Sequence, residues 1–117
     1  MAEENERPWG RYDILYERQG LKVKIISIKP NQKFSLQYHN RRAEFWTITS
    51  GSGKVRVGDL EREVSLGDFI EVPRKAVHRA EAYDGGLEFV EVQMGGVDES
   101  DIVRLEDDYG RVKKNGQ

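Results

Sequence analysis

The chain contains no cysteine, which excludes both a disulfide framework and a thiolate metal site. No apolar run approaches the roughly 20 residues that a membrane-spanning helix needs. The first residues are acidic and polar and lack the apolar segment of a secretion signal. Neither sign of charge prevails, because 19 basic and 21 acidic residues leave a net charge of −2. No global field therefore favours nucleic acid or a membrane surface, and we expect a cytoplasmic domain with neither partner.

The length of 117 residues suits one domain built around a single core. We expect residues 1–6 to form a disordered leader, 7–111 the folded domain and 112–117 a flexible tail. No internal repeat, linker or long helical stripe interrupts the chain.

Short runs rich in β-branched and aromatic residues alternate with turn signals along most of the sequence. The expected strands are 11–18, 21–29, 33–39, 43–49, 54–57, 60–66, 69–72, 77–83 and 87–94. Residues 50–53 and 58–59 are expected turns, residues 84–86 are expected to close a last hairpin, and 98–105 to hold a short helical turn and a strand. About nine strands predict an all-β sandwich or barrel, and the pattern alone does not separate an immunoglobulin-like sandwich from a double-stranded β-helix.

Four polar residues offer the chemistry of a metal site. Gln37 and His39 are two residues apart and so share one face of a strand, and Glu44 opens the next apolar run. We expect these donors to converge from two adjacent strands. The only other histidine, His78, follows a later strand. A mixed nitrogen and oxygen set without sulfur suits one divalent ion of Zn, Mn, Fe, Co or Ni.

The spacing of these residues resembles the two signatures of the cupin superfamily. Gln37–x–His39–x4–Glu44–x6–Gly51 is similar to the first signature, with Gln37 where most cupins have histidine. Gly67–x5–Pro73–x4–His78 is similar to the second, with Lys75 in place of its second glycine. The resemblance implies a cupin double-stranded β-helix, a single-domain jelly-roll barrel, with Gln37, His39, Glu44 and His78 as the metal ligands.

Within the cupins, the chain resembles the isomerase domain of the type II phosphomannose isomerases, which is often fused behind a mannose-1-phosphate guanylyltransferase. The matching pieces run roughly from Arg7 to Arg111 and include Arg7-Pro-Trp-Gly10, Arg42-Ala-Glu44, Glu91-Val-Gln93, Asp101-Ile-Val-Arg104 and Tyr109-Gly-Arg111. The resemblance implies a metal-dependent interconversion of mannose 6-phosphate and fructose 6-phosphate, which would supply mannose for polysaccharide or nucleotide-sugar synthesis. The chain has no Gly-rich nucleotide loop, so we do not expect nucleotidyl transfer.

Such a reaction needs a base that moves a proton through an enediol and a cation that holds the phosphate. Arg42, Lys24 and Arg111 match family positions and are the expected phosphate ligands. Glu91 and Arg111 are the expected catalytic residues. The alternation of the last strand leaves open whether Glu91 or Val90 faces the interior.

The chain departs from the family where Asn40, Arg41 and Phe45 replace histidines, which leaves the substrate open. A different cupin enzyme, a metal-dependent dioxygenase or epimerase, and a non-enzymatic sugar-binding cupin are the alternatives. Arginines at the barrel mouth would favour the isomerase, an apolar mouth the dioxygenase, and an occluded interior the binding role.

The expected first strand carries an apolar edge over Tyr12-Asp-Ile-Leu-Tyr16. An exposed edge of this kind invites pairing with another strand. We therefore expect a homodimer with this strand at or near the interface.

Overall fold

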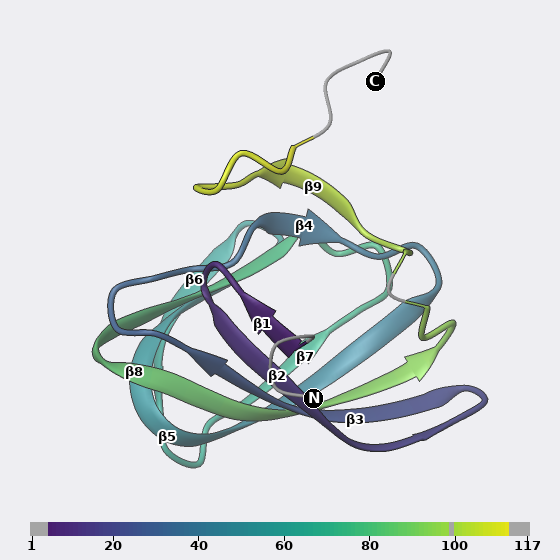
Figure 1. Ribbon diagram of the computed structural model, residues 1–117, viewed down its shortest axis with the longest axis horizontal. Helices are drawn as coiled ribbons and strands as arrows, with labels where there is room; N and C mark the ends of the chain where they lie inside the picture. The colour runs from purple at the N-terminus through teal and green to yellow at the C-terminus, as the bar shows by residue number, and fades with distance from the viewer. Residues whose placement is uncertain (1–4, 99, 113–117) are drawn as a thin grey trace.

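The computed structural model describes residues 5–98 and 100–112, in which nine strands curl around one interior (Figure 1). The strands are β1 (Glu6–Arg7), β2 (Gly10–Arg18), β3 (Leu21–Ile28), β4 (Leu36–Tyr38), β5 (Arg42–Val57), β6 (Leu60–Ser65), β7 (Phe69–Val72), β8 (His78–Gly95) and β9 (Val103–Glu106). The all-β prediction is confirmed. β1 begins at Glu6, inside the stretch expected to be disordered, whereas residues 1–4 of that leader and 113–117 of the expected tail lie outside the described residues.

Strand β8 organises the sheet, since it pairs antiparallel with β3, β4 and β5. One path of strands runs β1-β2-β3-β8-β4-β9, and β5 leaves it to pair with β6 and β7 as well. The strands β4 and β5, which carry the metal-site motif, each pair with β8 rather than with one another. The expectation that their donors converge from adjacent strands is therefore wrong, and β8 is the element that brings them together.

Two expected turns are bends within long strands. Residues 50–53 lie inside β5 and residues 84–86 inside β8, so the expected last hairpin does not form and both halves of β8 pair with β5. Gly51 has a φ of 79°, and a Cβ placed on it would lie 2.0 Å from the Gly86 carbonyl oxygen. The glycines thus allow close backbone approach where the pairing register shifts, rather than reversing the chain.

The other turns and strands follow the pattern with smaller differences. The expected turn at 58–59 is confirmed, because Val57 pairs with Leu60. The expected strands 11–18 and 21–29 form a hairpin around residues 19–20, because Arg18 pairs with Leu21. The expected strand 33–39 is reduced to β4, preceded by an isolated bridge at Lys33. In the segment 98–105, one turn is closed by the Asp101 amide donating to the Asp98 carbonyl before β9 begins.

The interior is apolar at one end and polar at the other. Trp46 stacks on Phe89 with ring centroids 4.5 Å apart, and both are fully buried. Further along the same inward faces lie Glu44 on β5 and Glu91 on β8, also buried. Because alternation places Leu87, Phe89, Glu91 and Gln93 inward together, Glu91 faces the interior, which resolves the alternative left open by the sequence. The described residues contain no helix with the length and apolarity that a membrane crossing needs.

Candidate metal centre

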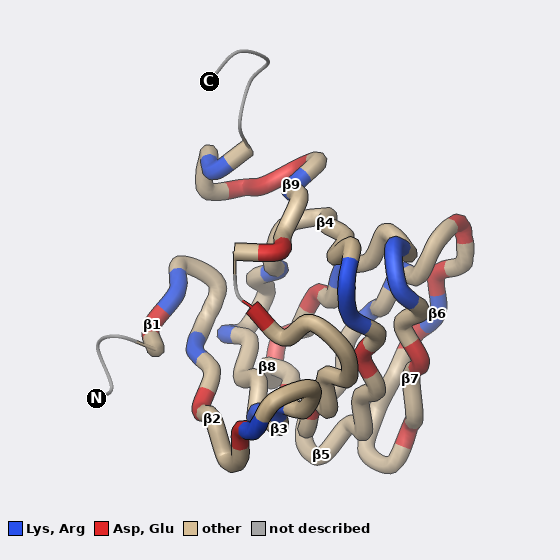
Figure 2. The backbone as a smooth tube through the Cα atoms, turned by 90° about the vertical axis from the view of Figure 1, so that its right-hand side faces the viewer, with Lys and Arg blue, Asp and Glu red and all other residues tan. Residues whose placement is uncertain are grey.

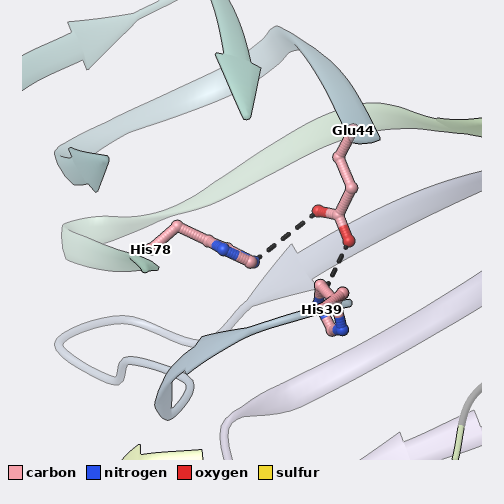
Figure 3. Close-up of side chains that lie close together, drawn as sticks. All are labelled: His39, Glu44 and His78. Atoms are coloured by element: carbon pink, nitrogen blue, oxygen red, sulfur yellow. Dashed lines mark ion pairs between the residues drawn. The ribbon is translucent and has the colours of Figure 1, made fainter. Parts of the chain in front are cut away.

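Three buried side chains point toward one another in the polar end of the interior (Figure 3). His39 follows β4, Glu44 lies near the start of β5 and His78 begins β8. The His39 Nε2 atom is 3.2 Å from Glu44 Oε2, and the His78 Nε2 atom is 3.8 Å from Glu44 Oε1. One donor atom from each of the three lies within 4.8 Å of the others. Ligands that share one Zn²⁺-sized ion at about 2.0–2.2 Å have comparable separations.

The two imidazoles are held in the tautomer that metal ligation needs. His39 Nδ1 lies 2.6 Å from the Asp101 carbonyl oxygen, and His78 Nδ1 lies 3.0 Å from that of Ala76. Because a carbonyl oxygen only accepts, each Nδ1 carries the hydrogen and each Nε2 keeps its lone pair. The His78 Nε2 atom is buried and has no hydrogen-bond partner among the described residues. A lone pair left without a partner in this position fits a metal ion.

Burial and charge keep these groups in their ligating forms at neutral pH. Burial lowers the pKa of His39 to about 4, although Glu44 opposes the shift, and burial likewise lowers the pKa of His78. Burial alone would raise the pKa of Glu44, but His78, Arg42 and His39 together lower it to about 2. Since the imidazoles are neutral at pH 7, Arg42 is the charge that holds the carboxylate ionised. Two neutral imidazoles beside one carboxylate are the forms that bind a divalent metal.

Arg42 and Trp46 fix the position of the Glu44 carboxylate. Arg42 donates to Glu44 Oε2 through Nε at 2.9 Å and Nη2 at 2.8 Å, and Trp46 donates to Oε1 at 3.0 Å. Arg42 Nη2 also lies 3.2 Å from His39 Nε2. The expected phosphate ligand Arg42 is therefore bound to the carboxylate. Its Nη2 would compete with an entering metal for the lone pair of His39 Nε2.

The fourth expected ligand, Gln37, lies opposite His78 in the β4–β8 pairing. Its amide nitrogen is 3.4 Å from His39 Nε2, and its amide oxygen accepts a hydrogen bond from Ser35 Oγ at 2.5 Å. An amide ligates a metal through its oxygen, so ligation by Gln37 requires the amide to turn over. The structure brings Gln37 to the centre, and its role as a ligand stays a prediction.

A cavity of about 150 Å³ opens beside this centre and is rich in positive charge. The charged residues that line it are Arg7, Lys24, Arg42, Arg104 and Arg111, together with Glu44 and Glu91. Basic and acidic residues are otherwise interspersed along the backbone (Figure 2). Among the expected phosphate ligands, Lys24 lies with its Nζ 4.1 Å from the Tyr12 ring centroid, and Arg111 binds Asp107 through two nitrogens.

Sequence reasoning missed two of the lining arginines, Arg7 and Arg104. Arg104 belongs to β9 and lies opposite Gln37 of β4, so both side chains lie on the same face. The family resemblance already included both arginines in its matching pieces, and that was the available signal.

Glu91 is a second buried carboxyl group in the cavity. Burial, reinforced by the negative charge of Glu44, raises its pKa to about 8 despite the nearby Lys24 and Arg42. Gln93, which is fully buried, donates its amide hydrogen to Glu91 Oε2. A buried carboxyl group that titrates near neutral pH and is oriented by a hydrogen bond suits proton transfer.

Comparison with known proteins gives one family over nearly the whole chain. The model of the mannose-6-phosphate isomerase C-terminal family matches residues 1–107. Mannose-1-phosphate guanylyltransferase ManC of Salmonella typhimurium is 36% identical over 116 residues, which are 96% of this chain and 24% of ManC. Alginate biosynthesis protein AlgA of Pseudomonas aeruginosa is 41% identical over 107 residues, which are 90% of this chain and 22% of AlgA. The chain thus spans about a quarter of the length of these relatives.

Solved structures support the fold. A conserved protein from Klebsiella pneumoniae with a double-stranded β-helix domain superposes with a TM-score of 0.73 at 21% identity, over 90% of this chain and 94% of that one. The cupin-2 domain protein Rru_A2000 of Rhodospirillum rubrum superposes with a TM-score of 0.66 at 21% identity, over 77% of this chain and 66% of that one. The expected cupin double-stranded β-helix is confirmed.

Proposed function

Since the chain belongs to the mannose-6-phosphate isomerase C-terminal family of cupin domains, we propose that it is a metal-dependent aldose–ketose isomerase that interconverts mannose 6-phosphate and fructose 6-phosphate. One observation carries the proposal. His39, Glu44 and the buried Glu91 carboxyl line one cavity together with five cationic side chains, and His78 is buried beside Glu44. Metal ligands, a proton-transfer group and phosphate-binding charge are the three requirements of this reaction.

Different residues carry out the proton transfer, orient the base and hold the metal. Ionised Glu91 removes the proton from C2 of the open-chain aldose, the electron pair of that bond forms the C1=C2 bond, and the C1=O π pair moves to O1 to give an enediolate. A proton then passes from O2 to O1, the O2 electron pair forms the C2=O bond, and the C1=C2 pair takes the proton back from Glu91 at C1 to give the ketose. Gln93 donates to Glu91 Oε2 and so fixes the orientation of the carboxyl group that takes and gives the proton. A divalent ion held by His39, Glu44 and His78 would supply a Lewis acid for the sugar oxygens at C1 and C2. Lys24, paired with Glu91 across β3 and β8, favours the ionised form of the base.

The composition of the cavity supports this function over the alternatives from the sequence. A dioxygenase is expected to have an apolar mouth, whereas seven of the fifteen residues that line this cavity carry charged groups. Relatives named for xanthan and alginate biosynthesis support a role in supplying mannose for polysaccharides. The cavity lies within the isomerase domain, so the proposal does not extend to the guanylyltransferase activity for which other relatives are named.

A coupled assay tests the proposal. The protein is stripped with EDTA, reloaded with Zn, Mn, Fe, Co or Ni, and given mannose 6-phosphate while fructose 6-phosphate is followed. We expect turnover with at least one metal, none in EDTA, and a loss of about 10²–10⁴-fold in kcat for Glu91→Gln. Absence of fructose 6-phosphate with all five metals would contradict the proposal.

A further inference from the structure

A second cavity, the outer pocket, lies on the outer side of the barrel wall and has a volume of about 130 Å³. Its charged lining residues are Lys33, Lys54, Arg56 and Arg79, with Glu61 and Glu81. Chain neighbours divide between the two cavities, since Phe34 and Gln37 line the interior cavity, whereas Lys33 and Leu36 line the outer pocket. Successive side chains of a strand point to opposite faces, so the sheet separates the outer pocket from the metal cluster. A ligand in the outer pocket would not contact that cluster.

Two arginines lie side by side in the outer pocket. Arg56 of β5 is directly opposite Arg79 of β8 in the antiparallel register. Like charges in this relation destabilise a strand pair, because the Cβ atoms of opposite residues are only about 5 Å apart. Glu61 of β6 lies opposite Arg56 on the other side, yet the two form no ion pair within the described residues. An anion between the two guanidinium groups would therefore offset a repulsion that the nearest carboxylate does not.

Both guanidinium groups are held through Nε, which directs their Nη atoms to other partners. Arg56 Nε donates to the Gly58 carbonyl oxygen at 2.8 Å, and Arg79 Nε donates to the Phe34 carbonyl oxygen at 3.0 Å. The Arg56 Nη atoms form no hydrogen bond with the part of the chain that the structure describes, and those of Arg79 reach only Glu106, at 3.3 and 3.5 Å. The Glu106 side chain is 67% exposed, and such a pair contributes little. Guanidinium groups fixed in this way lose little entropy when their Nη atoms bind an oxyanion.

Two lysines add to the positive charge of the outer pocket. Lys54 lies two residues before Arg56 on the same face of β5, and Lys33 is joined to Glu81 of β8 by an isolated bridge. Glu81 also lies opposite Lys54, but these two form no ion pair, and the one ion pair of Lys33 among the described residues is with Asp108, at 3.9 Å. Four cations against two carboxylates leave the lining with a formal charge of +2. That charge matches a dianion.

We propose that the outer pocket binds a small dianion of the phosphate-monoester class. The Nη groups of Arg56 and Arg79 hold it, together with the ammonium groups of Lys33 and Lys54. Donors that surround the pocket from three parts of the chain suit the tetrahedral oxygens of a phosphate better than the planar oxygens of a carboxylate. This ligand is a second one, in addition to the sugar phosphate of the interior cavity, and its binding requires neither the metal nor turnover.

NMR of the labelled protein distinguishes the two cavities in one titration. Glycerol 3-phosphate, a dianion at pH 7, is added to the metal-free protein in EDTA at constant ionic strength. The backbone amide of Arg79 reports the outer pocket, and the side-chain amide of Gln37 reports the interior cavity. We expect a saturable shift of the Arg79 signal with a dissociation constant of about 1 mM or less.

Substitutions at Arg56 test which side chain holds the ligand. Arg56→Gln should weaken binding at the Arg79 reporter by at least about 10-fold, and Arg56→Lys by less, because lysine keeps the charge and loses the fork. The Gln37 signal should respond to the ligand as it does in the wild type. The matched control is Arg74→Gln, which removes the same charge from an exposed position before β8 and should change the dissociation constant by less than about 2-fold.

Three outcomes would overturn the proposal. An Arg79 signal that does not saturate in the wild type, or an equal loss of binding in Arg56→Gln and Arg74→Gln, would show that the outer pocket is not a site. Tighter binding of succinate, a dianion with planar carboxylates, would refute the phosphate class. Thermal unfolding without ligand checks the fold of each variant, and Lys54→Gln, expected to weaken binding by at least about 3-fold, decides the question if Arg56→Gln does not fold.

Discussion

His39 and His78 are oriented toward Glu44 by the same kind of hydrogen bond. Each Nδ1 donates to a backbone carbonyl, and each Nε2 turns toward Glu44. We expect His39→Ala or His78→Ala to lower metal affinity by at least about 100-fold and to abolish isomerase activity. Gln37→Ala should weaken binding less, because an amide oxygen is a poorer donor than an imidazole. Elemental analysis after dialysis measures bound metal, and equal metal in wild type and His78→Ala would place the site elsewhere.

The pKa values of the ligands set how metal binding responds to acid. A protonated imidazole has no lone pair, so protons compete with the metal only as the pH falls toward the pKa of the folded protein. Burial lowers that pKa to about 4 for His39, and lowers it for His78 too, from the usual value near 6.5. We expect affinity to change little between pH 7 and 6 and to fall steeply below about pH 5. Metal titrations at fixed ionic strength measure it, and a midpoint near pH 6.5 would contradict the buried, neutral histidines.

Glu91 should make the metal-free protein less stable as the pH rises. Its pKa is raised from 4.5 to about 8 in the folded state, so the folded protein binds more protons than the unfolded chain between these values. The stabilisation is complete below about pH 4.5 and is lost as the pH rises toward 8, with a slope of at most about 1.4 kcal/mol per pH unit. Glu91→Gln does not titrate and should gain stability relative to wild type across this range. Urea unfolding in EDTA at pH 5, 6.5 and 8 measures the difference, and parallel curves would show that Glu91 is not buried as a neutral acid.

At the scale of elements, the segment before β9 holds the loop between β4 and β5. The Asp101 carboxylate accepts hydrogen bonds from the backbone amides of Asn40 at 3.0 Å and Arg41 at 2.8 Å. The backbone carbonyl of Asp101 accepts a hydrogen bond from His39 Nδ1. Outer ligands of this kind orient a metal-binding histidine. We expect Asp101→Ala to weaken metal binding by about 10–100-fold. Asp98→Ala, which removes an exposed carboxylate from the same segment, should leave the affinity unchanged, and equal losses in both variants would show a general loosening of the segment.

Local signals in the sequence were sufficient for the hairpins at 19–20 and 58–59 but not for the expected hairpin at 84–86. Alternation placed Gln37 and His39 on one strand face, because a strand's period of two is a local property, whereas His78 joined them through the resemblance to the second cupin signature. All three of His39, Glu44 and His78 are buried. The bends at Gly51 and Gly86 could not be separated from turns, since glycine serves both and the difference depends on which strand lies opposite. The pairing of β9 with β4 is likewise long-range, so strand alternation alone could not place Arg104 beside Gln37.

At the scale of the whole molecule, the net charge of the chain does not indicate how charge is distributed in the cavity. The formal charge of −2 gives no hint of the cavity, where five cationic side chains face two carboxyl groups. Such a concentration is possible because the fold gathers basic residues from β1, β3, β5, β9 and the segment after β9. An interior field of this sign attracts an anionic substrate without making the outer surface basic.

The outer edge of β2 is the remaining basis for the expected homodimer. β1 pairs only with Gly10 and Arg11 of β2, so β2 pairs only with β3 beyond that point among the described strands. Ile14, Leu15 and Tyr16 along this stretch are 44, 57 and 53% exposed. An apolar strand edge with unpaired backbone groups favours strand pairing across a two-fold axis.

We therefore expect light scattering at micromolar concentration to give twice the chain mass of 13.5 kDa. Leu15→Lys should shift the protein to the monomer, because it places a charge in the apolar contact. Leu60→Lys is the matched control, since Leu60 is 79% exposed at the start of β6 and away from this edge. A wild-type mass of one chain would refute the dimer. A dimer that Leu60→Lys disrupts and Leu15→Lys does not would move the interface from β2 to the β6 side of the barrel.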